Sequence, residues 1–169
     1  MSHRPSLREV QHRGTILAHS YRTCWSNSIP MGPVGAYQLQ AAISAVHSEA
    51  AAWEETDWEQ IAELYSMLAR VAPSPTVTLN YAVAISEAHG PTSALRVLDP
   101  LLDDPRMSRS HRLYAVRAPI LEACGRHHEA LDAYRISSRL CTSIPEQRYL
   151  NSQIARLQVG IDRSSVSDS

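Results

Sequence analysis

Residues 76–102 read TVTLNYAVAISEAHGPTSALRVLDPLL, and residues 111–140 read HRLYAVRAPILEACGRHHEALDAYRISSRL. The two stretches carry the same signals in the same order. Gly90 and the Glu-Ala pair before it recur 35 residues later at Gly125. In each stretch the glycine separates two apolar runs of helical length. The sequence therefore predicts that one helix–turn–helix unit occurs twice in succession.

A two-helix repeat of this length is typical of tetratricopeptide-like folds, in which each unit buries its apolar face by stacking on the next. We therefore expect an all-α fold of tetratricopeptide-like antiparallel helix pairs, arranged as a short α-solenoid or a bundle. Six helices in three pairs are expected between about Ala36 and Gly160, and the helix that starts at Pro145 should cap the repeats. Six side chains are predicted to lie in the core: Leu64, Leu79, Ala118, Leu121, Ala130 and Tyr134.

The chain is expected to have three parts. Residues 1–34 are predicted to form a variable N-terminal helix and a linker rich in proline and glycine. Residues 35–160 are predicted to form the tetratricopeptide-like helical domain. Residues 161–169 are small and polar and are predicted to form a disordered tail.

The composition is that of an ordinary globular protein. Of 169 residues, 44% are hydrophobic and 20% are charged, and the formal net charge is −1. This charge gives no overall field that would hold nucleic acid or an anionic membrane. Three scattered cysteines without a CxxC motif favour a reducing compartment. No apolar run approaches the length of a membrane span, so a cytoplasmic location is expected.

Five segments, in a fixed order, resemble a known domain. They read GAYQLQAAISAVHSEA from residue 35, TDWEQIAELYSML, PSPTVTLNYAVAISEAHGP, ACGRHHEALDAY and PEQRYL. Over about residues 35–157 the chain resembles the C-terminal tetratricopeptide-like helical extension of a subgroup of bacterial extracytoplasmic-function (ECF) sigma factors.

This resemblance implies a regulatory module that modulates transcription initiation through contacts with sigma factor domains or RNA polymerase. The chain lacks the sigma DNA-binding domains, so we expect no direct DNA binding from this chain alone and no membrane association. Two alternatives stay open from the sequence. One is a generic tetratricopeptide adaptor unrelated to transcription, and the other is a non-functional gene fragment.

In tetratricopeptide repeats the first helix of each pair lines a concave groove. Aligning the two repeats on their glycines directs five side chains toward such a groove, where they would contact a protein partner. The alternative is a closed bundle that has no open groove. The predicted groove residues are Asn80, Tyr81, Glu87, Arg112 and Glu122.

A basic patch is predicted at the start of the second repeat. The sequence PRMSRSHRLYAVR ends at residue 117 and holds four arginines close to a helix N-terminus. Positive charge there opposes the helix dipole, so helix stability does not explain it. A surface that faces a partner is the functional interpretation, and an ordinary solvated face is the alternative. The patch consists of Arg106, Arg109, Arg112 and Arg117.

Catalytic and metal-binding signals are weak. The segment His47-Ser48-Glu49 resembles half of a zinc deaminase signature, but no PCxxC follows it. Cys124, His127 and His128 cluster at a turn without the spacing of a metal site. No HExxH, GxSxG or Walker motif is present. We therefore expect no enzyme activity, no catalytic residues, no metal and no cofactor. The aromatic residues Trp53, Trp58, Tyr65, Tyr114 and Tyr134 are expected to serve packing.

Overall fold

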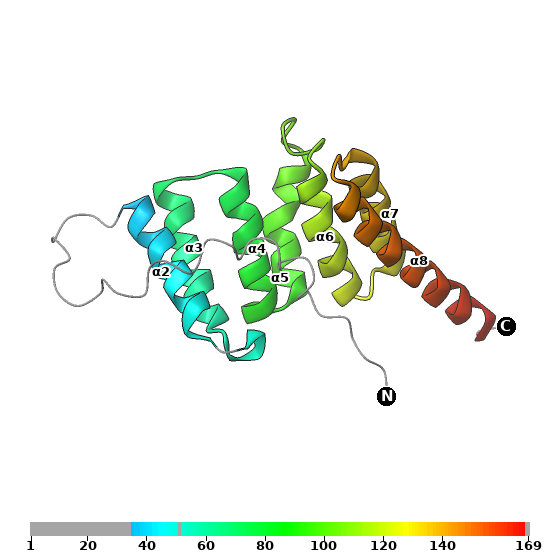
Figure 1. Ribbon diagram of the computed structural model, residues 1–169, viewed down its shortest axis with the longest axis horizontal. Coiled ribbons are helices and arrows are strands. Elements are labelled where there is room, and N and C mark those ends of the chain that lie inside the picture. Colours follow the sequence, from blue (N-terminus) through cyan, green and yellow to red (C-terminus); the bar gives the residue numbers. More distant parts are fainter. Residues whose placement is uncertain (1–34, 51, 168–169) are drawn as a thin grey trace. The chain divides into compact units, whose positions relative to one another are not determined.

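The computed structural model describes residues 35–50 and 52–167. The N-terminal helix and linker predicted for residues 1–34 lie outside this part. The chain divides into two compact units, one that ends at Pro73 and one that begins at Ser74. All regular elements within the described ranges are helices (Figure 1), which confirms the all-α prediction. None of these helices is long and apolar enough to cross a membrane.

The first unit is built on one helix pair. Its elements are α2 (Ala36–Glu49), the short 3-10 helix η2 (Trp53–Glu55) and α3 (Trp58–Val71). Helix α2 packs against α3, and each helix buries three apolar side chains. Those of α2 are Leu39, Ile43 and Val46, and those of α3 are Ile61, Ala62 and Leu68.

The second unit contains the two repeats found in the sequence. Helices α4 and α5 form the first pair, and α6 and α7 form the second. Helix α5 packs on α6, and α8 packs on α7, so the elements stack in chain order (Figure 1). The elements are α4 (Pro75–His89), α5 (Pro91–Leu98), η3 (Asp99–Leu102), α6 (His111–Ala123), α7 (His127–Leu140) and α8 (Ile144–Ser167).

The two glycines that mark the repeats hold different backbone conformations. Gly125 has φ 76° and follows α6. The N–H of Gly125 donates to the Glu122 carbonyl and the N–H of Arg126 donates to the Leu121 carbonyl, both at 2.9 Å. This pair of bonds is the Schellman motif. Gly90 instead joins α4 to α5 with φ 86° and ψ 161°, a combination that is nearly confined to glycine.

The predicted core is confirmed at five of its six positions. Leu79, Ala118, Leu121, Ala130 and Tyr134 are all buried. Leu64 is only half-buried, because the buried stripe of α3 runs through Ile61, Ala62 and Leu68 and leaves Leu64 at its margin.

The last helix is the capping helix that the sequence predicts, and it is longer than expected. Six helices form the three pairs, and α8, which packs on α7, is the seventh α-helix in the described ranges. Helix α8 also continues through Gly160 to Ser167, where a disordered tail is predicted. A single glycine inside a helix costs only about 1 kcal/mol, so Gly160 need not end it.

Candidate functional site

The predicted groove residues lie on two neighbouring helices of the second unit. Asn80, Tyr81 and Glu87 belong to α4, and Arg112 and Glu122 belong to α6. These helices begin the two consecutive pairs, and they contact each other. Asn80 and Arg112 are exposed, while the other three side chains are half-buried.

Glu122 already has a partner within the protein. Its Oε2 accepts a hydrogen bond from Nη2 of Arg156 at 2.7 Å. The same guanidinium donates through Nε to Oε1 of Gln153 at 3.0 Å. Arg156 and Gln153 lie on α8, so Glu122 ties α6 to the capping helix. A partner that docked on α6 would therefore meet a carboxylate whose charge is partly neutralised.

Tyr134 on α7 lies beside this ion pair. Its side chain is buried, at 3% exposure. Burial, and then the negative charge of Glu122, raise the pKa of the Tyr134 phenol far above its ordinary value. The phenol is therefore neutral at physiological pH and belongs to the core, as the sequence predicts.

Two of the four arginines of the basic patch are paired with acidic side chains. Arg106 lies 3.4 Å from Asp104, measured between Nη2 and Oδ2. The backbone N–H of Arg106 also donates to Asp104, and these contacts hold the pKa of the Asp104 carboxyl below its ordinary value. Arg117 pairs with Asp99 at the start of η3. Both arginines thus form ion pairs with acidic residues of the segment that connects the two repeats.

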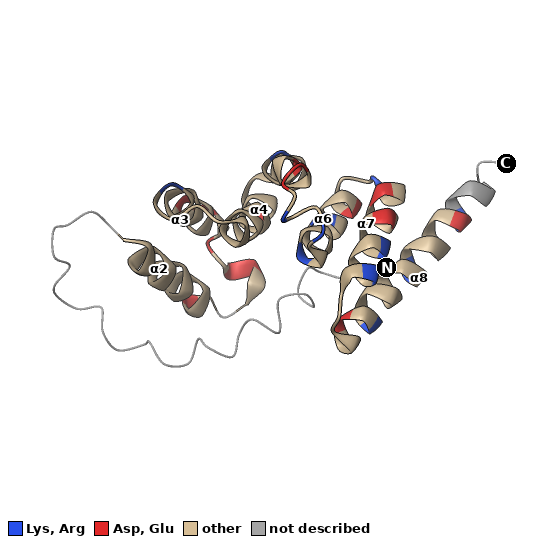
Figure 2. Ribbon diagram, turned by 90° about the horizontal axis from the view of Figure 1, so that it is seen from above, with Lys and Arg blue, Asp and Glu red and all other residues tan. Residues whose placement is uncertain are grey.

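Arg109 and Arg112 are the patch residues that remain available. Both are exposed, and neither forms an ion pair with any of the described residues. Figure 2 shows arginines in blue on α6, whereas α7 carries acidic residues in red along its first half and arginines in blue along its second half. Within the described part of the chain, two arginines of the basic patch therefore lack an ion-pair partner, one just before α6 and one in its first turn.

The structure also brings together three side chains that the sequence analysis does not connect. His111, Cys141 and Glu146 place their ligand-type atoms within 4.8 Å of one another. Nε2 of His111 lies 3.6 Å from Oε1 of Glu146. Cys141 is buried, at 3% exposure, and its Sγ donates to the Ser143 carbonyl at 3.7 Å.

These residues meet because helix ends meet. His111 begins α6, Cys141 is the C-cap of α7 and Glu146 lies in the first turn of α8. In antiparallel neighbours the end of one helix lies beside the start of the one before it and the one after it. A sequence-based search for ligand-type residues at matching helix ends could have found the group, whereas the search for short motifs could not.

Cys124, His127 and His128, for which the sequence predicts no metal site, lie at the turn between α6 and α7. Sγ of Cys124 lies 3.9 Å from Oγ1 of Thr92, and His127 and His128 are exposed on the first turn of α7. Within the described residues these three side chains do not form a group with metal-site distances.

His47 in the first unit packs against aromatic rings. Its ring meets Trp58 edge to face at 5.4 Å between centroids, and Trp58 lies 4.4 Å from Trp53. Burial lowers the pKa of the His47 imidazole. Ser48 donates its hydroxyl to the Ser44 carbonyl at 2.8 Å, as a helix-surface serine commonly does.

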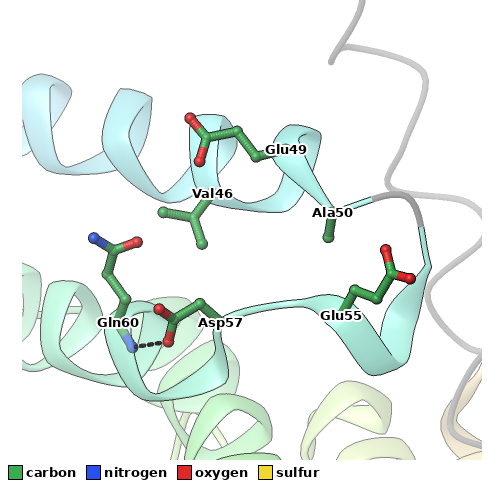
Figure 3. Close-up of a pocket in the computed structure, with 6 residues that line it drawn as sticks. All are labelled: Val46, Glu49, Ala50, Glu55, Asp57 and Gln60. Atoms are coloured by element: carbon green, nitrogen blue, oxygen red, sulfur yellow. Dashed lines mark hydrogen bonds between the residues drawn. The ribbon is translucent and has the colours of Figure 1, made fainter.

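The first unit also holds an open pocket. It is lined by Val46, Glu49, Ala50, Glu55, Asp57 and Gln60. Figure 3 shows that its three carboxylates come from different elements and point in different directions. One of them, Asp57, accepts the N–H of Gln60 at 2.9 Å as the N-cap of α3. The pocket therefore presents negative charge without converging ligands.

Comparison with known proteins relates the chain to part of a longer protein. No protein-family model matches the chain. A protein of Rhizobium meliloti (strain 1021), described only as uncharacterized, is 42% identical over 123 residues. The match covers 73% of this chain and 29% of the relative. The chain thus spans less than a third of the relative, and the similarity relates it to one segment of a longer protein.

Proposed function

We propose that the chain is a protein-interaction and regulatory module, and not an enzyme. Its partner is a sigma factor or RNA polymerase, and it modulates transcription initiation through that contact. The proposal starts from the resemblance of residues 35–157 to the helical extension of ECF sigma factors. The relative from Rhizobium meliloti is compatible with it, because the similar segment is a minor part of a longer protein.

The observation that carries the proposal is the stacking of α4 on α6. These are the first helices of consecutive pairs, and in tetratricopeptide-like folds such helices form the recognition surface. Arg109 lies just before α6 and Arg112 lies in its first turn, and both are exposed and form no ion pair with the described residues. Exposed cations at such a surface favour an acidic partner segment, because charge complementarity guides association.

Direct recognition of promoter DNA is the less favourable use of these cations. Specific DNA binding normally draws on several phosphate contacts from clustered basic side chains. Two of the four arginines in the patch are already paired with Asp104 and Asp99. The two arginines that remain, Arg109 and Arg112, are few for the phosphate contacts that a DNA duplex requires. They are enough for a contact with an acidic segment of a protein.

Co-purification and a gel-shift assay on one preparation test the proposal. The purified full chain is mixed with bacterial RNA polymerase core and with purified alternative sigma factors. We expect retention of one of these proteins and no shift of promoter DNA by the chain alone. Tight, salt-sensitive and sequence-selective DNA binding without a protein partner would overturn the proposal. Retention of neither protein would leave the generic adaptor as the better interpretation.

A further inference from the structure

We propose that His111, Cys141 and Glu146 form a binding site for a borderline-soft divalent cation, Zn²⁺ above all, at the junction of α6, α7 and α8. The three side chains offer one nitrogen, one sulfur and one oxygen. Imidazole and thiolate together select Zn²⁺ and similar transition metals over Mg²⁺ and Ca²⁺, which prefer oxygen ligands alone.

The distances are close to those that a tetrahedral ion needs. Ligand atoms at Zn²⁺ bond lengths of about 2.0–2.3 Å lie roughly 3.3–3.8 Å from one another around a tetrahedron. The observed 3.6 Å between His111 Nε2 and Glu146 Oε1 falls in this range. No separation in the group exceeds 4.8 Å, so the side chains of His111 and Glu146 would have to move toward Cys141 by at most about 1 Å.

The two more exposed ligands can supply this movement. The side chains of His111 and Glu146 are 28% and 38% exposed, whereas Cys141 is held in the interior. Their exposure also gives an ion a path from solvent. Rotation of the His111 and Glu146 side chains can therefore bring their ligand atoms to bonding distance of an ion held by Cys141. The helix packing need not change.

Hydrogen bonds to the backbone hold the helix ends that carry the ligands. Oγ of Ser137, which is fully buried, donates to the His111 carbonyl at 2.9 Å. Nε2 of Gln147 donates to the Cys141 carbonyl at 2.7 Å and to the Ser138 carbonyl at 3.3 Å. The backbone at the site is therefore ordered in advance, which lowers the conformational cost of binding an ion.

Three protein ligands leave the fourth tetrahedral position to a water molecule. On binding, the Cys141 thiol releases its proton to solvent and a sulfur–metal bond forms, and the ion keeps its charge throughout. The ion would link three helix ends and so stabilise the last repeat together with its capping helix. This inference is independent of the identity of the protein partner.

Cobalt substitution tests the site in the full chain. The variant Cys24→Ser/Cys124→Ser leaves Cys141 as its single thiol. After reduction and removal of metals, we expect Co²⁺ to give thiolate-to-cobalt charge-transfer absorption at one ion per chain, and Zn²⁺ to abolish it by displacement. Adding Cys141→Ser should remove the absorption. If the single-thiol chain showed no charge-transfer absorption with Co²⁺, the proposal would be overturned.

Variants of the two more exposed ligands, His111 and Glu146, provide a second test. This test does not depend on a change at the buried cysteine, which could itself cause misfolding. Loss of a group outside the ligand shell typically weakens metal binding 10- to 100-fold. We therefore expect Glu146→Gln and His111→Gln to weaken Co²⁺ binding by at least about tenfold. The matched control His128→Gln, at an exposed site on α7, should bind like the parent. Equal Co²⁺ affinity in Glu146→Gln, His111→Gln and the parent, with unchanged helical circular dichroism, would contradict the proposal.

Discussion

Glu122 and Arg156 lie on α6 and α8, and their side chains meet at 2.7 Å between Oε2 and Nη2. Glu122 is one of the residues that the repeat alignment directs toward a groove. Its carboxylate instead joins the second repeat to the capping helix. Any contact of α6 with a partner must therefore rely first on the exposed residues near its N-terminus.

The Glu122–Arg156 pair should contribute measurably to stability. In a double-mutant cycle with Glu122→Gln and Arg156→Gln, we expect a coupling of about 1 kcal/mol, because Arg156 is still solvated enough to weaken the attraction. Urea unfolding of the four proteins gives this value. The exposed pair Asp132–Arg135 is the control and should show no measurable coupling. Equal coupling in the two cycles would contradict this account of α8.

The close approach of α6 and α7 depends on a small side chain at Ala130. This residue is fully buried. Ala130→Arg would force an unpaired charge into the core, and we expect destabilisation by several kcal/mol. Ala155→Arg, at an exposed position of α8, is the control and should melt like the parent. If the two variants had the same melting temperature, the described packing of the second repeat would be contradicted.

The two repeat glycines should respond differently to substitution. A Cβ at Gly90 or at Gly125 would meet no atom within 4 Å, so only the backbone conformation decides the cost. We expect Gly125→Ala to cost about 1 kcal/mol, as for other residues in the left-handed region. Gly90→Ala should cost more, up to about 3 kcal/mol, because φ 86° with ψ 161° is nearly confined to glycine.

Chemical unfolding of both glycine variants checks this order. Gly125→Asn is a useful companion, since asparagine is accepted at the end of a Schellman motif. It should be less destabilising than Gly125→Ala. A larger loss in Gly125→Ala than in Gly90→Ala would contradict the two turn geometries.

The helical architecture could be predicted because its signals are local. The apolar spacing and the repeated glycine mark each helix and each turn without knowledge of the rest of the chain. The length of α8 was underestimated, since Gly160 and the polar residues after it resemble a helix end. The different conformations of Gly90 and Gly125 follow from the next residue, because Pro91 favours an extended ψ at Gly90, whereas Arg126 puts no such limit on Gly125.

The candidate sites were predicted less well because they depend on tertiary contacts. The sequence could place Glu122 on the first helix of a repeat, but Arg156 reaches it only through the packing of α8. In the sequence, Cys141 is one of three scattered cysteines without a motif. Its neighbours His111 and Glu146 are adjacent only when the ends of three helices come together.

Buried Tyr134 predicts a loss of stability at alkaline pH. Its pKa is raised in the folded protein, so below about pH 10 the phenol is neutral in both folded and unfolded chains. Above that pH the unfolded chain releases the proton and the folded protein keeps it, so the unfolding free energy falls as pH rises. Lysine is absent from the sequence, which removes the other abundant titration in this range.

Urea unfolding between about pH 8 and 11 measures this effect. Tyr134→Phe should show a smaller decrease than the parent. Tyr37→Phe changes a side chain that is 88% exposed and should follow the parent curve. The interpretation fails if Tyr134→Phe and the parent lose stability in parallel.

The central claim, recognition of a sigma factor or RNA polymerase near the start of α6, is tested most directly by a measurement of affinity. The full chain, Arg112→Glu and the control Arg139→Glu are each titrated against the purified partner. Arg139 is also exposed, but it lies on α7, the second helix of its pair. We predict that the parent and Arg139→Glu bind alike, and that Arg112→Glu binds at least about tenfold more weakly, with an affinity less sensitive to salt. Equal affinity of all three proteins, or no binding by the parent to either partner, would contradict the claim.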